Sequence, residues 1–231
     1  MEPRQQNTGT LDISRAIQHP FEDQTWINKI LIGALIGIVP ILGFATIGYM
    51  IEVLRSNAEG RELPLPEWND IGAKLVEGLK FVVVTFIYSL PIVLLSCGFI
   101  VLGGGLAAVS DGRDMSDAVG AGISLIGVTM ACLVMLYGLF LGYLSPALAI
   151  QYMRTRDIGA CLRFGQILAI ARRNSGQYVM AVIVTIGASF GLGLVSSVIP
   201  LLGILVALAA APYLLMLQGH LFGQYARLNN L

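Results

Sequence analysis

The sequence has few charged residues, and this shortage excludes a water-soluble protein. Only 12% of the 231 residues are Asp, Glu, Lys or Arg, whereas soluble domains carry roughly 25%. So small a share cannot cover the surface of a globule in water. The charges also balance, with 14 basic and 14 acidic residues. We therefore expect no basic surface that would favour nucleic acid as a partner.

Cysteine and histidine are also scarce. The cysteines are Cys97, Cys132 and Cys161. Their odd number and wide spacing exclude a disulfide framework and a cysteine-based metal site. The two histidines, His19 and His220, lie far apart in the sequence, and a single His is a poor metal ligand set. We interpret His220 as a polar residue near a helix end, beside Gln224, and expect no metal or other cofactor.

Apolar residues are abundant, at 56% of the chain. A helix needs about 20 apolar residues to cross the hydrocarbon of a membrane. Five stretches approach or exceed that length: residues 30–53, 81–106, 120–150, 178–197 and 201–225. None alternates apolar and polar residues as a barrel wall does. We predict an all-α integral membrane protein with a polar N-terminal segment over 1–29 and one helical membrane domain over 30–231.

The first apolar stretch either crosses the membrane or folds back at Pro40. If it folds back, Lys and Arg collect more completely on one side, which the positive-inside rule favours. Residues 38–43 also resemble residues 198–203, the expected turn of the last hairpin. We favour four transmembrane helices plus a membrane-embedded N-terminal hairpin, with a fifth spanning helix as the alternative. In both cases loops 54–80 and 151–177 and the C-terminus are cytoplasmic.

Two connecting segments, residues 66–80 and 157–173, place apolar residues at helical spacing among basic ones. Amphipathic helices of this kind lie in the membrane interface with Lys and Arg near anionic headgroups. We predict two interfacial helices, with a solvent-exposed linker as the alternative. The residues expected to face lipid are Trp68, Lys74, Lys80, Arg163, Arg172 and Arg173. Cys161 should react with a membrane-impermeant thiol reagent only from the cytoplasmic side.

Glycines four residues apart are the strongest local pattern. The pairs are Gly33 and Gly37, Gly138 and Gly142, Gly187 and Gly191, and Gly219 and Gly223. Such pairs allow helices in lipid to approach closely. We interpret them as packing positions within the helical bundle, with an oligomer interface as the alternative.

Four groups of residues resemble a known family. They are His19-Pro20-Phe21 with Trp26 and Lys29; Gly60 with Leu65-Pro66-Glu67-Trp68 and Gly78-Leu79-Lys80; Ile87-Tyr88-Ser89-Leu90-Pro91; and Gly219-His220-Leu221-Phe222-Gly223-Gln224. Together they are similar to the prokaryotic membrane-protein family known as domain of unknown function four-zero-one-three, over nearly the whole chain. The resemblance implies a multi-pass protein of the prokaryotic cytoplasmic (inner) membrane. It supplies no activity, substrate or catalytic residue.

The pattern of ionisable residues favours a non-catalytic function. The apolar cores of the last four stretches contain no Asp, Glu, Lys or Arg, which ion-coupled carriers normally need. No acid–base pair is readable, so we expect no enzyme. The sequence favours an accessory or scaffold subunit, or a lipid-organising protein, that binds another membrane protein or itself. The alternative is a transporter or channel for a neutral or amphiphilic solute, with helices broken at Pro40 and Pro91 lining its pathway.

Overall fold

The computed structural model describes residues 9–61, 63–109, 117–198 and 200–231, and the regular elements in these ranges are α-helices. The chain forms two compact units. Unit 1 comprises Met1–Val84 and Pro146–Leu231, and unit 2 comprises Thr85–Ser145. The single helical membrane domain over 30–231 stays a prediction. The boundaries between the two units fall inside two long helices, so the sequence has no linker at these points.

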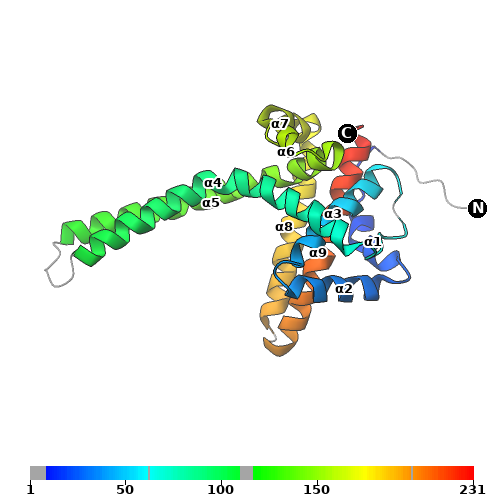
Figure 1. The fold of residues 1–231 in the computed structure, drawn as a ribbon, viewed down its shortest axis with the longest axis horizontal. Coiled ribbons are helices and arrows are strands. Elements are labelled where there is room, and N and C mark those ends of the chain that lie inside the picture. Colours follow the sequence, from blue (N-terminus) through cyan, green and yellow to red (C-terminus); the bar gives the residue numbers. More distant parts are fainter. Residues whose placement is uncertain (1–8, 62, 110–116, 199) are drawn as a thin grey trace, which may run out of the picture. The chain divides into compact units, whose positions relative to one another are not determined.

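Four helices are long and apolar enough to cross a membrane. They are α4 (Ile71–Val109), α5 (Asp117–Thr155), α8 (Ser175–Val198) and α9 (Pro200–Leu228), labelled in Figure 1. A helix satisfies its backbone hydrogen bonds internally, which is the condition for crossing hydrocarbon. The prediction of an all-α, multi-pass membrane protein with four long apolar helices is confirmed.

The first apolar stretch forms a helical hairpin and not a fifth long helix. It is divided between α2 (Trp26–Ile38) and α3 (Gly43–Ala58), of 13 and 16 residues. At a rise of about 1.5 Å per residue, neither reaches the roughly 30 Å of a hydrocarbon core. Val39 adopts an extended conformation, as the residue before a proline commonly does. Pro40 therefore marks the break.

The two predicted interfacial helices differ from the observed elements. Residues 66–70 are not helical, and the rest of the first segment is simply the start of α4. The side chain of Asp70 caps that helix by accepting a hydrogen bond from the Ala73 amide at 3.0 Å. Helix α4 continues without a break from Lys80 to Phe81, so no separate interfacial helix forms. The second segment is divided into α6 (Ile158–Cys161) and α7 (Phe164–Arg173).

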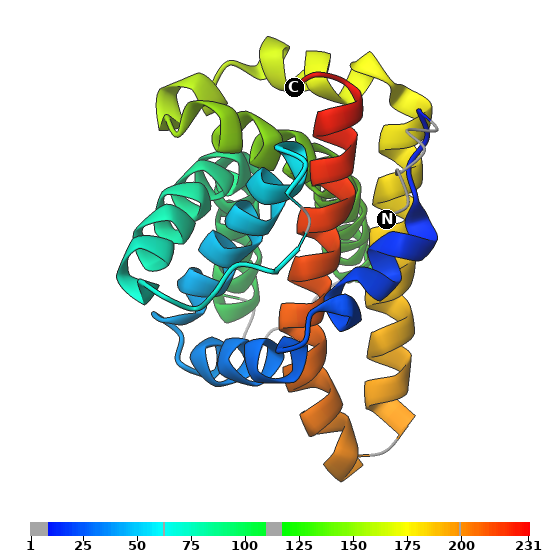
Figure 2. The same cartoon turned by 90° about the vertical axis from the view of Figure 1, so that its right-hand side faces the viewer.

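Helix α9 is the centre of unit 1. It packs against α1 (Ile13–Glu22), α2, α3 and α8, and Figure 2 shows these helices around it. Its second half is almost entirely buried, including Met216, Leu217, Leu221 and Tyr225. Burial of this half on all sides fixes the positions of the surrounding helices.

Glycines allow α3 to contact two helices through the backbone. A Cβ at Gly219 would lie 2.9 Å from the Met50 carbonyl oxygen, and one at Gly223 would lie 2.8 Å from the Leu54 carbonyl oxygen. On its other side α3 meets α4, where a Cβ at Gly48 would overlap the Lys74 carbonyl group. Any larger residue would separate these helices.

The other glycine pairs have different surroundings. A Cβ at Gly33 would lie 3.0 Å from both Pro212 and Trp68. The remaining glycines of the predicted set would meet nothing within 4 Å in the described chain: Gly37, Gly138, Gly142, Gly187 and Gly191. The structure therefore places Gly33, Gly219 and Gly223 against other segments of unit 1, and leaves these five facing open space.

The close contact of α3 with α9 predicts that Gly219→Ala destabilises the fold. The added methyl group would press on the Met50 carbonyl, and overpacking of this kind costs about 1–3 kcal/mol. Gly187→Ala is the matched control, because its methyl group enters open space and alanine favours helix by about 1 kcal/mol. Thermal unfolding of the detergent-solubilised protein measures both. Equal midpoints for the two variants would contradict the backbone contact between α3 and α9.

Candidate functional site

A buried ion pair network surrounds Lys29, in the first turn of α2. Its Nζ lies 2.9 Å from the Asp23 carboxylate, 2.9 Å from the Glu67 carboxylate and 2.7 Å from the Leu65 carbonyl oxygen. The side chain is only 2% exposed. An ammonium group has three donor hydrogens, and these three acceptors match them. The charge is therefore compensated in the interior.

Asp23 is the second member of this network. Besides Lys29, its carboxylate accepts hydrogen bonds from the amides of Thr25 and Leu65, at 2.7 and 2.8 Å. Burial raises the pKa of this carboxyl, but the hydrogen bonds that it accepts outweigh burial and hold the pKa at about 2. Asp23 is thus charged at neutral pH and holds the 65–68 loop against the start of α2.

Trp68 is buried in this loop, although we expected it to face lipid. Its Nε1 donates to the Lys29 carbonyl at 2.9 Å, and its ring stacks on Tyr49 with centroids 4.4 Å apart. The Tyr49 hydroxyl donates to the Pro66 carbonyl at 2.9 Å. Trp68 therefore packs α2 against α3. Apolar residues at helical spacing give the same sequence pattern whether they pack on protein or on lipid. Here Trp68 packs on protein.

Lys74 also departs from the prediction of a lipid-facing residue. It is 8% exposed, and its Nζ lies 2.7 Å from the Glu52 carboxylate and 3.0 Å from the Asn69 carbonyl oxygen. This ion pair joins α3 to α4 beside their contact at Gly48. Lys80, the other basic residue predicted in this segment, is partly buried.

The three arginines of the third loop are exposed: Arg163, Arg172 and Arg173. Their contact with lipid headgroups stays a prediction. The apolar face of α7 is not exposed with them. Ile167, Ile170 and Ala171 are buried against the rest of unit 1. Helix α7 is consequently held by protein contacts, and only Leu162 and Phe164 remain as large exposed apolar side chains beside these arginines.

The two histidines meet in the core of unit 1. His19 and His220 are fully buried, with ring centroids 3.9 Å apart. His220 Nε2 lies 2.6 Å from the side-chain nitrogen of Gln224, whose oxygen accepts from the Asp12 amide at 3.0 Å. These contacts join α1 to α9. Two imidazoles alone make an incomplete metal site, and no group of three or more His, Cys, Asp or Glu gathers among the described residues.

Two further residues of the family motif, Tyr88 and Pro91, lie in α4 within unit 2. The Tyr88 carbonyl accepts a hydrogen bond from the Tyr137 hydroxyl of α5 at 2.7 Å. Pro91 lies inside α4. Of the motif residues of unit 2, Tyr88 thus joins α4 to α5.

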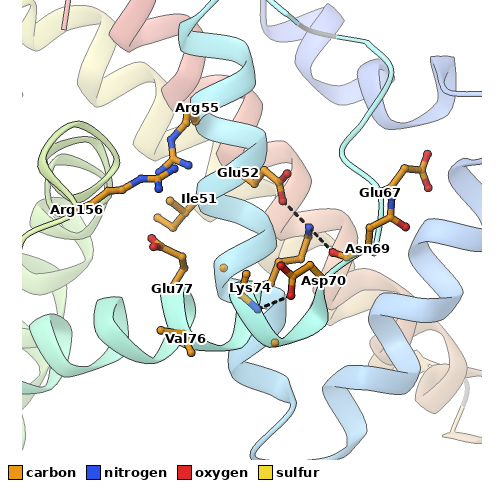
Figure 3. Close-up of a pocket in the computed structure, with 13 residues that line it drawn as sticks. Ile51, Glu52, Arg55, Glu67, Asn69, Asp70, Lys74, Val76, Glu77 and Arg156 are labelled. Carbon is orange, nitrogen blue, oxygen red and sulfur yellow. Dashed lines mark hydrogen bonds and ion pairs between the residues drawn. The ribbon is translucent and has the colours of Figure 1, made fainter.

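A cleft of about 760 Å³ opens between α3 and the start of α4 (Figure 3). Its lining is rich in charge: Glu52, Arg55, Glu67, Asp70, Lys74, Glu77 and Arg156. Apolar contacts come from Ile51 and Val76. The contact of α3 with α4 at Gly48 forms part of this lining, so the same glycine that joins the helices also shapes the cleft.

The acids of this cleft have partners. Glu52 pairs with Lys74, and Glu67 pairs with Lys29. The Glu77 carboxylate accepts a hydrogen bond from the Tyr152 hydroxyl at 3.0 Å. Asp70 caps α4, as described above. The arrangement can therefore bind a ligand through its remaining cations, Arg55 and Arg156.

From the sequence, most residues of this cleft could be recognised only as charged residues of the connecting loops. Arg55 and Arg156 belong to different loops, and no local pattern joins them. Asp23 had a weak signal, since an acid six residues before a lysine at a helix start can reach it. The two arginines line one cleft within unit 1 although they are far apart in sequence (Figure 3), and only the tertiary structure brings them together.

A family model described as "Protein of unknown function (DUF4013)" matches residues 31–201. The match covers about three quarters of the chain. It includes the 65–68 loop, Tyr88 and Pro91, whereas His19 and the 219–224 motif lie outside it. Comparisons with curated proteins and with solved structures found no match.

The network around Lys29 predicts a large loss of stability in Lys29→Met. Removing one partner leaves the Asp23 carboxylate buried without its counter-charge, which costs about 3–5 kcal/mol. Lys80→Met is the control, because it removes the same charge from a less buried position, and we expect less than about 0.5 kcal/mol. Thermal unfolding in detergent measures both. If Lys29→Met unfolds at the same temperature as Lys80→Met, the network is not a determinant of stability.

Cys161 is fully buried, which corrects the expectation that a thiol reagent reaches it from the cytoplasm. Burial raises the pKa of its thiol to about 11, so the reactive thiolate is scarce at neutral pH. We expect Cys161 to react with an impermeant maleimide only after denaturation. Gly165→Cys, at an exposed position of α7, should react in opened vesicles but not from outside intact cells. Labelling of Gly165→Cys in intact cells would reverse the predicted orientation.

Proposed function

The chain belongs to the protein family of unknown function (DUF4013), and from this premise we propose that it is a non-catalytic accessory or scaffold subunit of a membrane complex. Membership and the four long apolar helices make it a multi-pass membrane protein. We further propose the prokaryotic cytoplasmic membrane as its location, with loops 54–80 and 151–177 and the C-terminus cytoplasmic.

The observation that supports this function is the open small-residue surface of α8. Gly187 and Gly191 lie four residues apart, on one side of the helix, and a Cβ at either position would meet nothing within 4 Å. Large apolar residues beside them are exposed, including Ile183, Ile186 and Phe190. Small residues at this spacing allow a second helix to approach closely in lipid. This surface suits a transmembrane helix of a partner.

The way in which unit 1 uses its other glycines strengthens this proposal. Gly219 and Gly223 have the same spacing and are already covered by α3. The chain therefore shows how such a pair packs when a helix is available. In the Gly187 and Gly191 pair the same surface is present and uncovered within unit 1. A structural partner, either another protein or a second copy of this chain, would complete it.

The proposal predicts that Gly187→Ile with Gly191→Ile removes the partner. Bulky side chains would block the approach of a helix, whereas a Cβ at either position meets nothing within 4 Å in the described chain. Gly193→Ile is the matched control, because Gly193 is equally open but lies on a different side of α8 at 100° per residue. The tagged full-length protein is purified in gentle detergent, and the stoichiometry of co-purifying membrane protein is measured.

Loss of a stoichiometric partner in the double variant and its retention in Gly193→Ile would support the scaffold function. Retention in both variants would contradict the proposed surface. A self-complex that carries bound lipid would favour the lipid-organising function over the accessory one. Transport of a neutral or amphiphilic solute stays a prediction from the sequence.

A further inference from the structure

The cleft between α3 and α4 contains two arginines whose charges lack a partner. Arg55 projects from the last turn of α3, and Arg156 directly follows α5. Their guanidinium groups point toward one another in Figure 3. Neither forms an ion pair within the described parts of the chain, and Arg55 Nη2 is buried there without a hydrogen-bond acceptor. Two cations facing each other in this way favour an anion between them.

The electrostatics of Arg55 agree with this geometry. Burial, and then the neighbouring charge of Arg156, lower the pKa of Arg55 from its ordinary value. Glu77 faces the same space and opposes this shift, but its carboxylate is engaged by the Tyr152 hydroxyl. Glu52 is engaged by Lys74. The acids nearest the two arginines thus reduce the repulsion between them without closing an ion pair.

Arg156 is held in an unusual backbone conformation. Its φ is 51°, in the left-handed region that glycine and asparagine adopt readily and arginine does not. The residue ends α5, where its amide donates to the Tyr152 carbonyl at 2.8 Å. Glycine is the usual residue at this position of a helix end. Arginine here aims a cation into the cleft at a cost in backbone strain, as residues at binding sites often do.

We propose that Arg55 and Arg156 bind the phosphate group of an anionic ligand in this cleft. The planar guanidinium group donates two parallel hydrogen bonds to phosphate oxygens. Two such groups, supplied by segments that are far apart in sequence, could hold one phosphate from both sides. The site is distinct from the open surface of α8 and does not depend on the scaffold function.

The rim of the cleft favours a phospholipid as the source of this phosphate. Val76 lines the cleft and is 51% exposed, and Leu79 and Val83 continue from it at 46% and 40%. These residues are three and four apart, so they form one exposed apolar row along α4. Acyl chains could lie along this row while the headgroup reaches the arginines, as basic pockets near the membrane interface bind lipid headgroups. Soluble phosphate would use the arginines alone.

The test is a titration of the delipidated full-length protein in maltoside detergent at constant ionic strength. One arm uses dioleoyl phosphatidylglycerol, and a second uses inorganic phosphate against chloride. A third uses dioleoylglycerol, which has the acyl chains without the phosphate. The shift in thermal midpoint and the apparent Kd are measured for each probe. Stabilisation by phosphatidylglycerol alone identifies a lipid phosphate, and stabilisation by phosphate as well identifies a site open to soluble anions.

Three variants separate recognition from folding. Arg55→Gln and Arg156→Gly should each weaken binding by roughly tenfold or more, since a hydrogen bond between charged groups contributes that much. Glycine relaxes the left-handed position, so Arg156→Gly should unfold at the same or a higher temperature without ligand. Arg172→Gln with Arg173→Gln removes exposed charges from α7 and should leave the Kd unchanged.

Several outcomes would overturn this site. They are the absence of stabilisation by phosphatidylglycerol and by phosphate, equal stabilisation by dioleoylglycerol, and wild-type affinity in both Arg55→Gln and Arg156→Gly. An equal loss of binding in the α7 control would show that the attraction is diffuse and not specific to the cleft.

Discussion

The ammonium group of Lys29 is the contact on which the interior of unit 1 depends. A charge that is 2% exposed would be very costly without partners, because its desolvation must be compensated by close acceptors. The three acceptors come from two places: the end of α1 supplies Asp23, and the 65–68 loop supplies Glu67 and the Leu65 carbonyl. The same loop then places Trp68 between α2 and α3. One buried charge therefore determines how the N-terminal helices and the first loop are assembled.

Close contacts at glycines connect the interior around Lys29 to the cleft between α3 and α4. With α2 fixed by Lys29, α3 lies between α9 and α4, and it approaches both through backbone contacts at Gly219, Gly223 and Gly48. The ion pair of Lys74 with Glu52 forms beside the last of these contacts. This close approach of α3 to α4 places Arg55 in the lining of the cleft. The geometry of the charged surface thus follows from the close helix contacts together with the ion pair of Lys74 and Glu52.

The parts of the fold that depend on local composition could be predicted from the sequence. Four long apolar helices follow from the length of the stretches, and the break in the first stretch follows from Pro40. The roles of Trp68 and Lys74 could not be predicted in this way, because an amphipathic pattern does not distinguish a protein surface from a lipid surface. The cleft could not be predicted from the sequence either. In the sequence, Arg55 and Arg156 are simply basic residues of two different loops. Tertiary contacts bring them together.

The glycine surface of α8 could be recognised from the sequence, whereas the cleft of Arg55 and Arg156 could not. The reason is physical. Helix packing in lipid depends on small residues at a fixed spacing along one helix, so Gly187 and Gly191 carry their signal locally. An anion site depends on uncompensated positive charge, which is a property of the whole neighbourhood. It is identified only after the nearby ion pairs, such as Glu52 with Lys74, have been assigned. The left-handed backbone of Arg156 then has a physical explanation: glycine would relax the strain but would leave Arg55 without a second guanidinium group in the cleft.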